Sequence, residues 1–348
     1  MSTPIREVLA DRFVFGCHKF GFGPVPGGGP VDVDRHVVPM VKAALDLGIR
    51  TFDSAVLYRA TLQLGRSIER LGEDPNSIRF QTKCLRYLGL VAGPAVEHQP
   101  EAMLPGIPAR YLGLTDRWDP TAAGVEQQIC RERIEFGCDR LLGVALHDPP
   151  DMEKQVGLAW ERDVRPAVRY LQTAKAAGFV ERIGLGIKEP SFVHRFIAEE
   201  PGVLDYAGVT FCPSILAPLM KIVEAAQAQK FQVTLMGINY GQAFTLSQDP
   251  ATAPPFLYNY EIATAEERAL MASFYRICGS TPLLHLAAAV AGLLAVHFPD
   301  VVTQIVTSTM TPSRLAETVN LVREADVPAP VWSELKSAGL IPREFPVS

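Results

Sequence analysis

Amphipathic helical segments alternate with short apolar segments from residue 40 onward, and this alternation constrains the fold more than any other feature of the sequence. It indicates parallel βαβ units, because each helix carries the chain back to the start of the next strand. Seven strands are predicted, at residues 50–54, 79–84, 141–147, 182–187, 206–212, 233–238 and 302–308, and an eighth has a weaker signal. Helices are predicted between them at residues 37–47, 62–71, 122–136, 164–177, 217–229 and 263–278.

Two α/β folds share this alternation, and the placement of glycine separates them. A doubly wound sheet that binds a dinucleotide carries a glycine fingerprint directly after its first strand. None follows Asp53, and the Gly-rich run at residues 21–29 precedes the first predicted helix and is interrupted by prolines. The sequence therefore predicts an α/β fold of the (β/α)8 TIM barrel type, as a single domain over residues 1–348.

The charge balance bears on the class of partner. Lys and Arg number 33 against 38 Asp and Glu, which gives a formal charge of −5. This balance argues against nucleic acid and against an acidic membrane surface, so we expect a small-molecule substrate. The first residues lack the unbroken apolar region of a secretory signal, which predicts a cytoplasmic protein. No heptad or apolar seam marks an oligomer interface, and the oligomeric state is left open.

Two further features bear on membranes and metals. The apolar run at residues 283–298 is shorter than a membrane span and is predicted to be a buried helix. The six cysteines are scattered without a Cys-x-x-Cys pair, which fits reduced core thiols better than disulfides or a zinc site. We therefore expect no membrane segment and no bound metal.

Ionisable side chains stand at the ends of three predicted strands. Asp53, Lys83 and His147 end these strands, and Tyr58 follows Asp53 on a loop. The carboxyl ends of barrel strands meet around one point, so these four side chains are expected to lie together. Singly, such a lysine or histidine is usually solvated or structural. Together they suggest a proton-transferring tyrosine whose pKa is lowered by an adjacent ammonium and imidazole, with the carboxylate holding the lysine.

Two irregular segments are candidates for the rim of a site. Residues 85–120 are rich in Gly and Pro and too long for an ordinary βα connection, which indicates an active-site loop. Residues 247–260 form a second candidate. Trp118 is a candidate substrate contact, although aromatic residues in such a place equally serve to pin a loop.

The motifs DSAVLY, TK and LHDP, in that order on successive strands, resemble the Asp, Tyr, Lys and His tetrad of the aldo-keto reductases. The resemblance covers nearly the whole chain and includes ALDLGIRTFDSA, IGLGIK and IVTSTMTPSRLAET. It implies direct hydride transfer between the nicotinamide of NAD(P) and a substrate carbon, while Tyr58 moves the proton on oxygen. In the same terms, Lys83 and Asp53 tune Tyr58, and His147 orients the substrate oxygen.

The resemblance also implies a cofactor site with several departures from the usual pattern. Ser308 stands where many NADP-preferring members have a lysine, so the choice between NAD and NADP is left open. Lys188 and Gly208 fall near positions that commonly hold the carboxamide, and Arg59 replaces the usual glycine after the tyrosine. The terminal segment equally fits a plain capped helix that begins at Pro312. The predicted cofactor residues are Asp53, Lys188, Gly237, Thr307, Ser308, Thr309, Arg314 and Thr318.

The segments WDPTAAGV, HDPPD and VWSELKSAGLIP resemble the branch of the family that contains sugar and pyridoxal dehydrogenases. This resemblance implies oxidation of the cyclic hemiacetal of an aldose, or of a similar hydroxylated ring, to a lactone, with Tyr58 as the base. An NADPH-dependent aldehyde or ketone reductase is the first alternative, because the same tetrad works in both directions. A sensor or a lyase on the same barrel is the second, suggested by Lys188 and Gly208.

Overall fold

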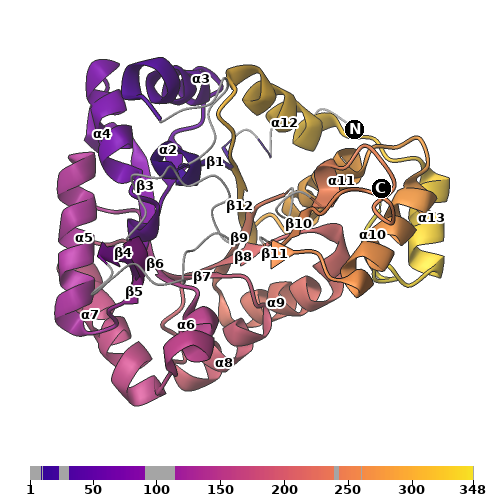
Figure 1. Ribbon diagram of the computed structural model, residues 1–348. Helices are drawn as coiled ribbons and strands as arrows, with labels where there is room; N and C mark the ends of the chain where they lie inside the picture. Colours follow the sequence, from indigo (N-terminus) through magenta and orange to yellow (C-terminus); the bar gives the residue numbers. More distant parts are fainter. Residues whose placement is uncertain are drawn as a thin grey trace. The chain divides into compact units, whose positions relative to one another are not determined.

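Eight parallel strands form a closed barrel in the order β1-β12-β9-β8-β7-β6-β3-β2, which confirms the predicted (β/α)8 fold (Figure 1). This computed structural model describes residue 9 and residues 11–22, 31–90, 114–238, 243–259 and 261–347. Seven strands lie at the predicted positions, and the eighth is β1, a short strand that precedes the first predicted helix. The barrel strands are β1 (Phe13–Gly16), β2 (Thr51–Asp53), β3 (Arg79–Cys84), β6 (Gly143–His147), β7 (Ile183–Ile187), β8 (Tyr206–Thr210), β9 (Gln232–Met236) and β12 (Val302–Thr307).

Strands β6 and β7 are short and apolar, and both faces of each are covered. Every residue of β6, GVALH, and of β7, IGLGI, is buried. Such continuous burial is typical of parallel strands, whose connecting helices cover the outer face while side chains fill the interior. The reactive residues at the strand ends are therefore held by a rigid frame.

The chain divides into two compact units, described here one at a time. The N-terminal unit comprises Val14–Gly208 and Ser308–Leu315, and the C-terminal unit comprises Met1–Phe13, Val209–Thr307 and Ala316–Ser348. The single domain expected from the sequence stays a prediction.

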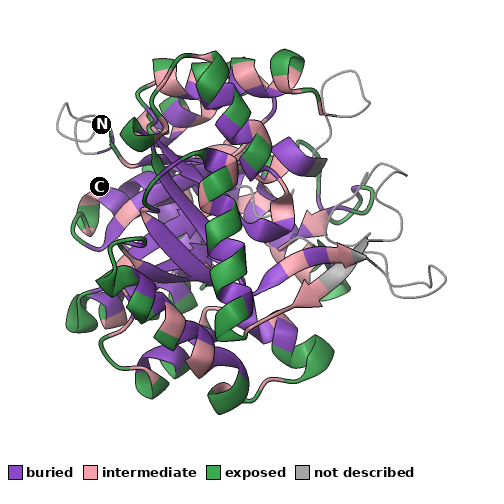
Figure 2. Ribbon diagram, turned by 90° about the vertical axis from the view of Figure 1, so that its left-hand side faces the viewer, coloured by how far each residue is buried: buried purple, intermediate pink, exposed green. Residues whose placement is uncertain are grey.

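In the N-terminal unit the helices pack beside one another around β2, β3 and β6. Helices α3, α4, α5 and α7 each carry both buried and exposed residues (Figure 2), as expected of amphipathic helices. Phe80 of β3 stacks on Phe136 of α5 with ring centroids 4.4 Å apart. The helices of this unit are α2 (His18–Phe22), α3 (Val38–Asp46), α4 (Thr61–Arg70), α5 (Ala122–Phe136), α6 (Pro149–Val156), α7 (Arg165–Ala176) and α8 (Ser191–Glu199), with short turns η1 (Val33–Val37), η2 (Val56–Tyr58), η3 (Pro75–Ser77) and η6 (Trp160–Val164).

In the C-terminal unit, the apolar run predicted to be a buried helix is α11. Leu286, Val290 and Leu294 of this helix are all fully buried, which confirms the prediction. Helix α12 begins at Pro312, as expected, in the N-terminal unit and continues into this one. The remaining elements are η7 (Pro213–Ile215), α9 (Leu216–Gln229), η8 (Ala243–Thr245), β10 (Leu257–Tyr258), β11 (Glu261–Ile262), α10 (Ala265–Cys278), α11 (Leu283–His297), α12 (Pro312–Glu324) and α13 (Ala329–Ser337).

The segment predicted as an irregular active-site loop, residues 85–120, begins and ends in strands. β4 (Arg86–Leu90) pairs antiparallel with β5 (Leu114–Trp118), with Arg86 opposite Trp118. Residues 91–113 of the predicted loop lie outside the described residues. The prediction of an irregular segment was therefore wrong at both flanks, because pairing across the segment satisfies backbone groups that composition alone assigns to a loop.

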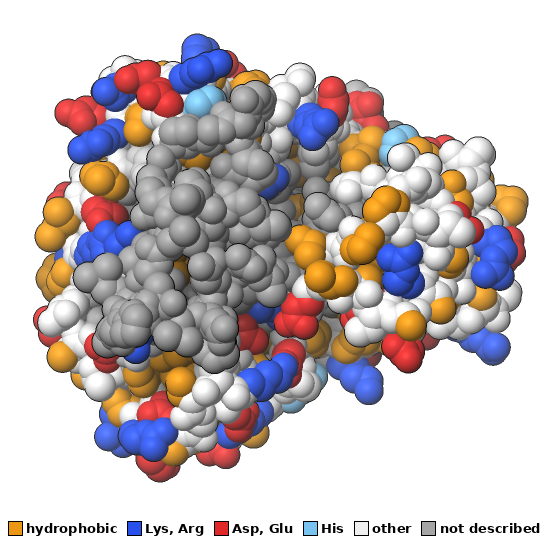
Figure 3. All heavy atoms as spheres, in the orientation of Figure 1, with side chains coloured by type: hydrophobic (Ala, Val, Ile, Leu, Met, Phe, Trp, Pro, Cys, Tyr) orange, Lys and Arg blue, Asp and Glu red, His pale blue; other side chains and the backbone are white. Residues whose placement is uncertain are grey.

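The structure also bears on membranes, metals and thiols. In the described part of the chain no single helix is long and apolar enough to cross a membrane; α10 and α11, bent by 88°, pass that test only as a pair, by length and composition. No cluster of three or more metal-binding side chains occurs among those residues. The cysteines are free, and Cys130 alone of the six is exposed. Basic and acidic side chains are interspersed on the face drawn in Figure 3.

Candidate active site

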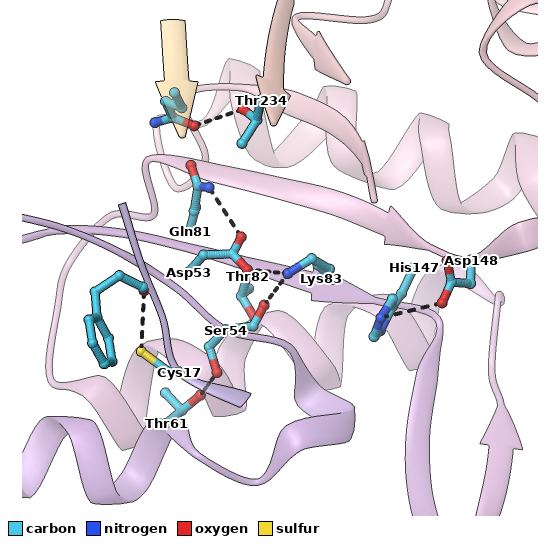
Figure 4. Close-up of polar contacts among 12 residues, drawn as sticks. Cys17, Asp53, Ser54, Thr61, Gln81, Thr82, Lys83, His147, Asp148 and Thr234 are labelled. Atoms are coloured by element: carbon cyan, nitrogen blue, oxygen red, sulfur yellow. Dashed lines mark hydrogen bonds and ion pairs between the residues drawn. The ribbon is translucent and has the colours of Figure 1, made fainter. Parts of the chain in front are cut away.

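The three charged strand ends lie on neighbouring strands of the N-terminal unit. Asp53 ends β2, Lys83 lies one residue before the end of β3, and His147 ends β6. The parallel registers pair Asp53 with Gln81 of β3, and Lys83 with Ala145 of β6. Because these strands run side by side in one direction, their side chains gather at the same carboxyl end (Figure 4).

Lys83 is fixed by a buried ion pair. Its ammonium binds the Oδ1 of Asp53 and donates to the carbonyl oxygen of Ser54 at 2.8 Å. The other oxygen of Asp53 accepts from the Nε2 of Gln81 at 3.1 Å. The side chains of Lys83 and Asp53 are only 3% and 7% exposed. A pair this deep is tolerated because each charge has hydrogen-bond partners, and its geometry is correspondingly rigid.

Tyr58 joins this pair from the short turn η2. The Nζ of Lys83 lies 5.2 Å from the centroid of the Tyr58 ring. The ring of His147 lies 5.6 Å away, edge to face at 89°. The structure thus brings together all four residues that the sequence proposes as a tetrad, within one unit of the chain.

The backbone of Tyr58 is held by a close approach of α2. A Cβ built on Gly21 would lie 1.8 Å from the carbonyl oxygen of Tyr58, so only glycine fits there. Arg59 ends η2 with a φ of 52°, a left-handed conformation that costs a non-glycine residue energy. A glycine would adopt that conformation at lower cost.

The titration of Tyr58 differs from the sequence-based expectation. Burial raises the pKa of Tyr58 above its ordinary value, and the carboxylates of Asp53 and Asp148 raise it further. The predicted lowering was wrong because the cost of burying a phenolate outweighs the nearby cation of Arg86. Tyr58 is therefore a phenol at neutral pH, the protonation state from which a proton can be donated.

Burial also lowers the pKa of His147 well below its ordinary value, and the cations of Lys83, Arg86 and Lys188 add to this. The imidazole is consequently neutral at physiological pH. Its Nδ1 is buried and has no hydrogen-bond partner among the described residues. A buried polar atom without a partner is uncommon in proteins and points to an oxygen or nitrogen of a ligand.

Sequence reasoning missed two groups beside the tetrad. His18 of α2 lies 6.0 Å from the Tyr58 ring, and burial, with Lys19 and Lys83, lowers its pKa to about 3. It follows β1, the strand with the weakest sequence signal. The second group is an ion-pair network of Arg86 from β4, Asp148 after β6 and Asp151 of α6, joined by Lys188 after β7. Lys188 was named from the sequence only as a cofactor residue. Charged residues directly after predicted strands were the available signal for this network.

Trp118, the candidate substrate contact, is anchored on both sides. Its ring lies 5.1 Å from the guanidinium carbon of Arg86, and its Nε1 donates to the Oε1 of Gln155 at 3.1 Å. These contacts fit the alternative role of pinning the segment to α6. Its contact with substrate stays a prediction.

The sequence profile of the Aldo/keto reductase family matches residues 14–338. This chain belongs to that family. This chain is 24% identical over 318 residues to the D-threo-aldose 1-dehydrogenase of Pseudomonas sp, and the matched region covers 89% of each protein. Two solved structures share its fold. An aldo-keto reductase of Bacillus halodurans in its holo form has a TM-score of 0.65 at 15% identity, and the glycerol dehydrogenase of Gluconobacter oxydans has 0.62 at 16%; each match covers 97% of this chain and 93% of the other.

Membership makes this aldo/keto reductase an NAD(P)-dependent oxidoreductase. Three predicted cofactor residues, Ser308, Thr309 and Arg314, lie on one segment of the N-terminal unit. The Oγ of Ser308 is buried without a partner among the described residues. The pKa of Lys19 is lowered mainly by burial and also by the charge of Arg314. A buried hydroxyl without a partner in the described part of the chain, together with these cations, fits the phosphates and ribose of a nucleotide.

The other predicted cofactor residues are placed as follows. Lys188 Nζ binds the Oδ2 of Asp151 at 2.8 Å, and Asp53 is committed to Lys83. Gly237, Thr307 and Thr318 lie in the C-terminal unit. Their roles in this aldo/keto reductase stay predictions.

Proposed function

We propose that this aldo/keto reductase oxidises the cyclic hemiacetal of an aldose, or of a similar hydroxylated ring, to a lactone, with Tyr58 as the general acid/base. The observation that carries the proposal is the position of Tyr58, next to the ion-paired Lys83 and to a neutral His147 whose Nδ1 has no partner in the described part of the chain. The similarity to a D-threo-aldose 1-dehydrogenase supports a sugar as the substrate.

The residues divide the work of the reaction. NAD(P) bound in the cofactor site would accept the hydride from the anomeric carbon. The phenolic oxygen of Tyr58 receives the proton of the anomeric hydroxyl, and the ammonium of Lys83 stabilises the phenolate that this requires. Asp53 holds Lys83 in place. His147 orients the substrate through its Nδ1, which has no partner among the residues that the structure describes.

Carbonyl reduction is the second candidate, and the titration of Tyr58 favours it. A raised pKa keeps Tyr58 protonated at neutral pH, which is the form that gives a proton to an alkoxide and not the form that removes one from a hydroxyl. Oxidation should then speed up as pH rises, whereas reduction proceeds at neutral pH. The direction of the pH dependence therefore separates the two reactions.

The first test offers NAD or NADP with aldoses, uronic sugars and pyridoxal at mildly alkaline pH and follows absorbance of the reduced nicotinamide. We expect one sugar to give a rise, and Tyr58→Phe to lose at least about a hundredfold in kcat, as removal of a general acid/base does. Tyr58→Phe should still quench cofactor fluorescence on binding. Tyr170→Phe, a partly exposed tyrosine of α7, is the matched control. Full turnover by Tyr58→Phe would exclude the mechanism.

A further inference from the structure

Four charged side chains beside the tetrad form a network that the mechanism above does not use. The Nη1 of Arg86 lies 3.1 Å from the Oδ2 of Asp151 and 3.5 Å from that of Asp148. The Nζ of Lys188 lies 2.8 Å and 3.8 Å from the same two atoms. Arg86 is completely buried. Charges this deep are costly, so a network of two cations and two carboxylates holds its members in one arrangement.

The network reaches the tetrad through Asp148. This residue follows His147 with a φ of 45°, and its Oδ2 lies 3.8 Å from the His147 Nε2 (Figure 4). A non-glycine residue rarely adopts this backbone conformation, so it persists only because surrounding contacts impose it. One ring nitrogen of His147 thus faces a carboxylate, and the other, Nδ1, is buried with no partner among the residues the structure describes.

A carboxylate beside one nitrogen of a neutral imidazole decides which nitrogen carries the proton. The negative charge of the carboxylate stabilises an N–H group of the imidazole that points to it, and it repels a nitrogen lone pair in the same place. Both effects are stronger in the low-polarity interior of the protein. His147 is kept neutral by burial and by Lys83, Arg86 and Lys188, which lower its pKa. The proton of the neutral ring therefore belongs on Nε2. Nδ1 is left as a hydrogen-bond acceptor.

We propose that Asp148, held by Arg86, Asp151 and Lys188, is a positioning residue that keeps the His147 proton on Nε2. Nδ1 then accepts a hydrogen bond from a substrate hydroxyl other than the one that gives its proton to Tyr58. The proposal rests on the proposed function and deepens it, because an acceptor at this place selects hydroxylated rings. A simple aldehyde or ketone presents only oxygen lone pairs and would meet the lone pair of Nδ1.

The network also predicts a pH dependence. Burial raises the pKa of Asp148 to about 6, Asp151 raises it as well, and Lys188, Arg86 and Lys83 oppose them. Below that pH the carboxyl is neutral and no longer biases the ring. The proton of His147 is then shared between its two nitrogens.

The test is the tautomer of His147, measured by two-bond 1H–15N correlation on protein labelled with 15N-histidine. His147→Gln assigns the signal, and no substrate is needed. We expect the Nε2–H tautomer in the wild type above about pH 6 and a mixture below it. Asp148→Asn should give the mixture at every pH. Lys188→Met removes a cation that lowers the Asp148 pKa, so the transition should move upward by about one pH unit.

The control is Asp163→Asn, another buried carboxylate, which pairs with Arg162 in η6. It should leave the His147 signals unchanged. A wild-type Nδ1–H tautomer, or a tautomer insensitive to Asp148→Asn in folded protein, would overturn the proposal.

A second experiment measures substrate preference once an active sugar is known. Asp148→Asn should lose roughly tenfold in its preference for that sugar over a simple aliphatic aldehyde, as expected for one hydrogen bond. An unchanged preference would also overturn the proposal. Failure of every sugar would refute the proposed function alone, because the tautomer is read without turnover.

Discussion

Gly186 of β7, which has no side chain, leaves room for Lys83 of the tetrad. A Cβ on Gly186 of β7 would lie 2.8 Å from the Cδ of Lys83, whose ammonium is fixed to Asp53 and Ser54. The stem cannot move away without displacing the ammonium, and small misplacements of reacting groups are costly. We therefore expect Gly186→Ala to lower kcat by roughly tenfold to a hundredfold with little change in cofactor affinity. A double-mutant cycle with Lys83→Met checks the cause, since the two effects should not add; full additivity would show that Gly186 acts elsewhere.

At the scale of elements, one buried carboxyl ties α5 to its neighbours. The Oε2 of Glu132 accepts from Thr61 of α4 at 2.8 Å and from Thr82 of β3 at 2.6 Å. Burial raises the pKa of Glu132 from 4.5 to about 7. The folded state thus binds more protons between these values, so this contribution to stability is complete below about pH 4.5 and is lost as pH rises through about 7. Glu132→Gln keeps both acceptor contacts without the charge and should be more stable than the wild type at about pH 8, by at most on the order of 3 kcal/mol. Urea unfolding across pH measures the difference, and Glu126→Gln, exposed on the same helix, should show none.

For the whole molecule, hydrophobic periodicity predicts the barrel, and the residues at the ends of its strands predict most of the tetrad. Asp53, Lys83 and His147 could be placed together because parallel strands bring their carboxyl ends to one edge. The ion-pair network of Arg86, Asp148, Asp151 and Lys188 could not be predicted. It depends on left-handed backbone conformations at Leu85 (φ 83°) and Asp148 (φ 45°), which periodicity does not reveal. The sign of the Tyr58 shift was also out of reach, because depth of burial is a property of the folded chain.

The preference between NAD and NADP can be measured by how much each cofactor stabilises the folded protein. Anything that binds only the folded state stabilises it, by about 2.7 kcal/mol at a hundred times Kd. Ser308 supplies no cation for a 2′-phosphate, so Arg314, whose charge is felt by Lys19, is the candidate to bind one. We expect Arg314→Met to reduce the rise in Tm caused by NADP more than the rise caused by NAD, with the exposed Arg343→Met as control. Equal losses for the two cofactors would assign Arg314 to a part of the nucleotide that both share, and no loss would remove it from the site.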